Sequence, residues 1–153
     1  MVKQSETDVV LIDPVIPDAE VIERAAALLR RGELVVFPTE TVYGLGADVL
    51  QPAALEGIFA AKGRPFSDPL IVHIADYATL ETLTASIPEA ARQLARAFWP
   101  GPLTLILPRG ERVPQIVTAG METVAVRMPS HPVARALITC LLYTSPSPRD
   151  RQK

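Results

Sequence analysis

Short apolar runs rich in β-branched residues alternate along this chain with segments of helical periodicity. Each run is bounded on at least one side by glycine or proline, which is typical of buried strands. The predicted strands are 34–37, 70–74, 103–107 and 123–128, and the predicted helices are 18–31, 52–62, 88–99 and a helix that begins at Pro132. Such an alternation predicts an α/β fold, in which helices cover the faces of a sheet.

The ends of the predicted helices carry specific signals. Asp18 is a good N-cap and Gly32 a good stop for the first helix. Pro52 suits the first position of the second helix, which Gly63 ends. Between these helices the segment 39–48 contains two glycines and is predicted to be a loop. The helix over 88–99 is expected to bury four residues, Ala91, Leu94, Ala95 and Phe98.

Composition limits what the chain can be. With 153 residues, 48% of them hydrophobic, it is long and apolar enough for one globular domain. The net charge of −2 leaves no excess to coat nucleic acid, so an anion site must be a local cluster. One cysteine and two histidines exclude an internal disulfide and leave too few ligands for zinc. No signal peptide or membrane-spanning run is visible, and we expect a soluble cytoplasmic protein.

The last residues differ in kind from the rest. The helix that begins at Pro132 runs into CLLYTSPSPRDRQK, where Pro146 and Pro148 forbid its continuation. We therefore expect a domain over residues 1–139 and a tail over 140–153. That tail is either a frayed terminus or a non-native segment resembling adapter read-through at the end of a gene fragment.

Two segments could hold a polar ligand. The sequence PTETVYGLGAD follows a strand and combines hydroxyls, an acid and two glycines, although its Gly44-x-Gly46 lacks the third glycine of a dinucleotide fingerprint. Lys62 and Arg64 would point to the same side of an extended chain and could clamp phosphates without a P-loop. The alternatives are a tight loop that needs glycine for its backbone, and solvated cations at a helix C-terminus.

Two charged or titratable residues fall inside apolar strands. His73 lies in LIVHI, where a lone histidine is more often a core residue than a catalytic one. Arg127 lies in VAVRMP, where a guanidinium costs desolvation unless a carboxylate or phosphate meets it. Its partner could be an acidic residue of the protein or a ligand carboxylate.

Four motifs, taken in order, resemble the YrdC-like threonylcarbamoyl-AMP synthase family: PTETVYGLGAD, KGRPFSDPLIVHI, FWPGPLTLIL and TVAVRMPSHP. The resemblance implies a YrdC-like twisted mixed sheet flanked by helices, incomplete at the C-terminus. It also implies synthesis of L-threonylcarbamoyl-AMP from L-threonine, bicarbonate and ATP, with release of pyrophosphate. A partner tRNA threonylcarbamoyl-transferase would then use that product to modify tRNA.

The resemblance also implies roles for particular residues. Threonine would be held by Thr41, His73 and Arg127. ATP would be held by Lys62 and Arg64, which are also the implied catalytic residues, together with Asp68 and Thr123. Asp68 stands where the family commonly has asparagine, and an anion there is tolerable if a magnesium ion lies between it and ATP. We expect Mg²⁺ to accompany ATP without a dedicated protein site.

One motif of the family is missing. The family pattern has a Ser-x-x-Asn motif after the helix that follows Arg127, whereas this chain contains no asparagine. We therefore expect the 153-residue chain to be inactive or impaired. Two alternatives stay open: a non-catalytic module that binds double-stranded RNA or tRNA through a local basic patch, and a domain that forms a carbamoyl-adenylate for another acceptor.

Overall fold

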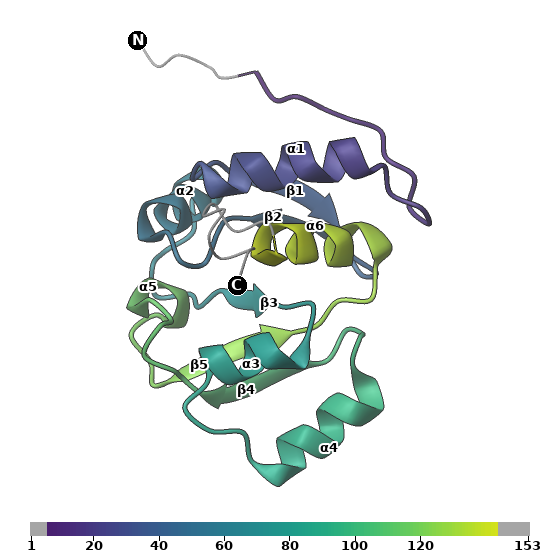
Figure 1. Ribbon diagram of the computed structural model, residues 1–153. Coiled ribbons are helices and arrows are strands. Elements are labelled where there is room, and N and C mark those ends of the chain that lie inside the picture. Colours follow the sequence, from purple (N-terminus) through teal and green to yellow (C-terminus); the bar gives the residue numbers. More distant parts are fainter. Residues whose placement is uncertain (1–5, 144–153) are drawn as a thin grey trace.

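The computed structural model describes residues 6–143 and confirms the α/β class (Figure 1). Helices and strands alternate along most of the chain, as the periodicity predicts. In chain order the described elements are α1 (Ala19–Arg30), β1 (Val35–Pro38), β2 (Tyr43–Gly46), α2 (Pro52–Lys62), β3 (Ile71–His73), α3 (Tyr77–Leu83), α4 (Glu89–Phe98), β4 (Thr104–Pro108), α5 (Gln115–Thr118), β5 (Thr123–Arg127) and α6 (Pro132–Tyr143).

The strands form two separate sheets. Strands β1 and β2 pair as an antiparallel hairpin, in which Val35 lies opposite Gly46 and Pro38 opposite Tyr43. The second sheet has the order β3-β5-β4, with β5 parallel to β3 and antiparallel to β4. Because β5 lies in the centre, its last residue has a neighbour on each side.

Each sheet has its own hydrophobic core. Helices α1 and α6 lie side by side against the hairpin (Figure 1), where Ala26, Phe37 and Ala134 pack together in the first core. The second core surrounds the three-stranded sheet, whose central strand contributes Val124 and Val126. Burial of these apolar side chains supplies most of the stabilisation of such a domain.

Local signals explain where two of the helices begin and end. The Asp18 carboxylate accepts hydrogen bonds from the backbone N–H groups of Glu20 (2.8 Å) and Val21 (3.2 Å), which caps α1 as predicted. Helix α2 begins at Pro52 and ends before Gly63, whose φ of 61° is the left-handed conformation that glycine adopts at low cost.

The prediction of a loop over 39–48 is wrong in its second half, because Tyr43–Gly46 forms β2. Two glycines in four residues weaken the sequence signal for a strand. Here the glycines give the Phe37 ring room on the neighbouring strand. A Cβ atom at Gly46 would lie only 2.6 Å from Phe37 Cε1.

Two further differences concern helices. Helix α4 buries Ala91 and Ala95 as predicted, but Leu94 and Phe98 remain 42% and 57% exposed. Its apolar stripe is therefore wider than the surface it covers. The short helices α3 and α5 are absent from the sequence prediction, since each is too brief to show a helical period.

Helix α6 continues to Tyr143, four residues past the domain boundary expected at 139. The thiol of Cys140 donates to Glu23 Oε2 on α1 (2.8 Å), so this part of α6 is in contact with α1. Residues 144–153 of the expected tail lie outside the described residues. In the described part of the chain, every helix is too short or too polar to cross a membrane.

Candidate functional site

Arg127 lies at the end of the central strand β5, opposite His73 of β3 and Thr104 of β4. Only 10% of its side chain is exposed. Its Nε donates to the backbone oxygen of Gly101 (3.2 Å), and its Nη1 donates to the hydroxyl of Thr41 (3.3 Å). Burial lowers the pKa of this guanidinium, which nevertheless stays charged at neutral pH.

The counter-ion of Arg127 is Glu40, in the turn between β1 and β2. One carboxylate oxygen accepts from Arg127 Nη2. The other accepts from the backbone N–H and the hydroxyl of Ser130. A carboxylate of the protein therefore meets the buried arginine, which answers the question that the sequence left open.

The turn over 39–42 is held by its own hydrogen bonds. The hydroxyl of Thr39 donates to the backbone oxygen of Val42 (2.5 Å) and accepts from the backbone N–H groups of Thr41 (3.3 Å) and Val42 (3.2 Å). Such side-chain-to-backbone hydrogen bonds stabilise the turn locally, in addition to the contacts of Glu40 and Thr41 with Arg127. The turn presents Glu40 and Thr41 together toward the end of β5.

His73 lies beside this group and joins the two sheets. Its ring meets the Phe37 ring of β1 edge to face, with a centroid distance of 6.1 Å. Burial lowers the pKa of His73 below its ordinary value, so the imidazole is neutral at pH 7. A neutral imidazole can both donate and accept a hydrogen bond, as recognition of a hydroxyl requires.

The depressed pKa of His73 predicts a pH dependence of stability. The unfolded chain binds the His73 proton as the pH falls below about 6.5, whereas the folded chain binds it only at lower pH. Stability is therefore lost as the pH falls from that value through the folded pKa. Unfolding by urea, compared at about pH 7.5 and about pH 5, should show a smaller loss in His73→Gln than in the unmodified chain. Equal losses would contradict a buried neutral His73.

The predicted phosphate-binding residues lie elsewhere along the chain. Lys62 is exposed at the end of α2, and Arg64 follows it. Arg64 Nη2 donates to the backbone oxygen of Pro69 (2.9 Å), and its Nε lies 3.4 Å from the Asp68 carboxylate. Arg64 and Asp68 thus form an ion pair just before β3. This pair partly offsets the negative charge of Asp68.

Thr123 is exposed at the first residue of β5, four residues before Arg127. At the rise of a β-strand these two residues are about 13 Å apart. Because β3 and β5 are parallel, Asp68, three residues before β3, lies toward the same end of the sheet as Thr123. The structure therefore brings together Thr41, His73 and Arg127 at one end, and leaves Thr123, Asp68 and its ion-pair partner Arg64 toward the other.

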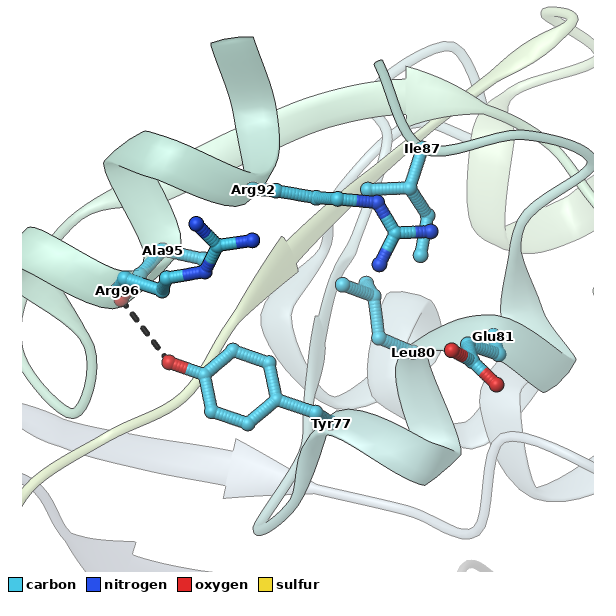
Figure 2. A pocket seen from close by; sticks show the side chains of 7 residues that line it. All are labelled: Tyr77, Leu80, Glu81, Ile87, Arg92, Ala95 and Arg96. Atoms are coloured by element: carbon cyan, nitrogen blue, oxygen red, sulfur yellow. Dashed lines mark hydrogen bonds between the residues drawn. The ribbon is translucent and has the colours of Figure 1, made fainter. Parts of the chain in front are cut away.

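Two hollows in the described surface lie outside this group of residues. One, of about 210 Å³, lies between α3 and α4, where Figure 2 shows Arg96 beside Tyr77 and Arg92 extending toward Ile87. The other, of about 410 Å³, is an apolar groove between α1, the hairpin and the segment that precedes α1. None of the predicted site residues lines either hollow.

Three contacts of the site were missed by sequence reasoning: Glu40, Ser130 and the backbone oxygen of Gly101. Glu40 was visible as an acid in the loop after a strand, but nothing local tied it to Arg127. Ser130 and Gly101 carried no signal, because they act through backbone groups or a single hydroxyl. The proline-rich corner that contains Gly101 therefore contributes a hydrogen-bond acceptor as well as packing.

A buried arginine beside a hydroxyl and a neutral imidazole, at one end of a sheet in an α/β domain, offers the donors that recognition of a small carboxylate requires. The family model for Sua5, YciO and YrdC, described as "Telomere recombination", matches residues 27–152. The chain belongs to this family.

The relatives carry a more specific name. A threonylcarbamoyl-AMP synthase of Pyrococcus abyssi is 58% identical over 117 residues, which are 76% of this chain and 34% of that protein. One from Halorhodospira halophila is 40% identical over 135 residues, covering 86% of this chain and 71% of that protein. The crystal structure of P. abyssi Sua5 complexed with L-threonine has a TM-score of 0.82 at 54% identity, over 83% of this chain and 37% of that one. The chain thus spans about a third of the P. abyssi relative.

Proposed function

We propose that this chain provides the catalytic domain for synthesis of L-threonylcarbamoyl-AMP from L-threonine, bicarbonate and ATP, for threonylcarbamoyladenosine modification of tRNA. The observation that carries the proposal is the convergence of Thr41, His73 and Arg127 at one end of the sheet. This convergence occurs in a chain closely similar to proteins named threonylcarbamoyl-AMP synthase.

The chemistry needs positioning more than a covalent nucleophile. The threonine amine reacts with bicarbonate to give a carbamate and water. A carbamate oxygen then attacks the α-phosphorus of ATP, and the bond from that phosphorus to the bridging oxygen breaks to release pyrophosphate. Arg127 would hold the threonine carboxylate, with Thr41 beside it, and His73 would orient the threonine hydroxyl. The residues at the two ends of β3 and β5 would hold the two substrates.

Charge at the phosphates would be balanced by Lys62 and Arg64, with Asp68 and Thr123 beside the nucleotide. Within residues 6–143, no three side chains of His, Cys, Asp or Glu gather in a way that could hold a metal ion. The Asp68 carboxylate is engaged by Arg64 (3.4 Å). Mg²⁺ would enter as the partner of the ATP phosphates, whose charge it neutralises.

The decisive experiment measures pyrophosphate release from ATP, with threonine and bicarbonate omitted in turn. Release that depends on both supports the proposal, and ATP hydrolysis that ignores threonine contradicts it. We further propose that turnover by the 153-residue chain is impaired, since it contains no asparagine for a Ser-x-x-Asn motif. A chain extended by a relative's segment with that motif should then be faster. Equal rates for the 153-residue chain and the extended chain would contradict the proposed impairment, but not the proposed reaction.

Asp68→Asn should strengthen ATP binding. The substitution removes an anion near the phosphates and releases the Arg64 guanidinium from its ion pair. We expect an affinity about 3-fold to 10-fold higher, the range for removal of one partly exposed like charge. Titration of ATP by calorimetry measures the change. Glu56→Gln, an exposed acid on α2 that is outside the predicted site, is the matched control, and weaker binding by Asp68→Asn would contradict the expectation.

A further inference from the structure

Glu40 is held more firmly than an ordinary counter-ion. Its two oxygens accept from three donors, namely Arg127 Nη2, the Ser130 backbone N–H and the Ser130 hydroxyl. Its side chain is only 21% exposed. Charge-assisted hydrogen bonds of this kind are about twice as strong as neutral ones. The two Ser130 contacts hold this carboxylate in place beside Arg127.

Arg127 keeps donors free even while Glu40 is bound. A guanidinium has five N–H donors. In the described structure three of them meet Gly101, Thr41 and Glu40, so two have no protein acceptor. A ligand carboxylate can therefore be bound without removing Glu40.

The charges of the site sum to zero. Arg127 is positive, Glu40 is negative, and burial keeps His73 neutral. An anion that enters such a site meets a cation whose charge is already balanced. A zwitterion makes two favourable ionic contacts in this site, because its carboxylate meets Arg127 and its ammonium meets Glu40. A carboxylate has about four lone-pair positions, of which three are used on Glu40.

We propose that Glu40 is a positioning and specificity residue: it stays on Arg127 during binding and makes the site select a zwitterionic amino acid over a simple carboxylate anion. The choice of an amino acid as ligand rests on the proposed function above. The role of Glu40 as the built-in carboxylate of Arg127 rests on the contacts alone.

The first arm of the test compares two ligands by calorimetry, L-threonine and 3-hydroxybutyrate, which lacks the amino group. Glu40→Gln keeps the shape of the side chain and removes its charge. We expect threonine binding to weaken at least about 10-fold, with 3-hydroxybutyrate binding unchanged or tighter. A merely structural loss would weaken both equally. Equal or tighter threonine binding by Glu40→Gln, or equal weakening of both ligands, would overturn the inference.

The second arm does not require threonine binding. Glu40→Ala leaves Arg127 without its counter-ion and opens space for a small carboxylate. Its lowered melting temperature should recover in sodium acetate more than in sodium chloride of equal ionic strength. Glu33→Ala, which removes an exposed acid paired with Arg31, is the matched control and should show no acetate effect. If the unmodified chain fails to bind threonine, the proposed function fails, while acetate rescue still supports the role of Glu40. Absence of rescue overturns the inference in either case.

Discussion

Replacing Arg127 with methionine is expected to weaken threonine binding at least about 30-fold, since truncating a buried charged hydrogen-bonding partner costs about 2–5 kcal/mol or more. Methionine fills much of the volume of the arginine stem but donates no hydrogen bond. Arg127 lies at the end of β5 and its side chain is nearly buried, so water cannot replace it cheaply. Calorimetric titration with L-threonine measures the loss.

Instability must be separated from lost binding in this variant. Arg127→Met leaves Glu40 without its counter-ion, which lowers stability in its own right. The double variant Arg127→Met with Glu40→Gln removes both charges, so it should be more stable than Arg127→Met while still failing to bind threonine. Arg31→Met, at an exposed surface ion pair, is the matched control and should bind normally. Threonine binding within a few-fold of normal in Arg127→Met would contradict the assigned role.

The second large effect is expected at Gly46, where Gly46→Ala should destabilise the domain by about 1–3 kcal/mol through overpacking. The new methyl group would lie 2.6 Å from Cε1 of Phe37. Displacing the Phe37 ring would disturb its packing with residues of α1 and α6 and its contact with the ring of His73. For a domain of this length the expected fall in melting temperature is about 2–4 °C per kcal/mol.

Gly57 offers a control, because the same glycine-to-alanine change there should raise stability and not lower it. Gly57 lies inside α2, where an added Cβ would be 3.6 Å from Leu34, an ordinary contact distance. Gly57→Ala should therefore stabilise the domain by about 0.5–1 kcal/mol, because alanine loses less conformational entropy in a helix. Denaturant unfolding of both variants tests the pair. Similar stability of Gly46→Ala and the unmodified chain would contradict the prediction, because it would show that the Phe37 ring moves aside at little cost.

Because Phe37 also touches His73, Gly46→Ala carries a functional expectation. A displaced Phe37 ring would shift the imidazole at the end of β3, so threonine affinity should fall together with stability. Gly57→Ala, which is remote from His73, should leave the affinity unchanged. The glycines of the YGLG segment are in this way explained by packing against an aromatic ring.

Most of the secondary structure was predictable from the sequence, and the reasons are local. Helix α1 follows from the Asp18 cap and its apolar period, and α2 from Pro52 and Gly63. Strand β2 was missed because its pairing with β1, and not its own glycine-rich composition, makes it a strand. Exposure of Phe98 on α4 was missed because a period shows which side chains share a face, and not how far the core extends.

The candidate site was also predictable only where its features depend on local sequence. The sequence by itself determined the α/β class, the family resemblance and the expectation that Arg127 needs an anionic partner, because these depend on residue type and on neighbours a few positions away. Only the tertiary structure decided that this partner is Glu40, 87 residues away, and that Ser130 supports it. Contacts of that span depend on how the hairpin packs against the three-stranded sheet, and no local pattern in the chain encodes that arrangement.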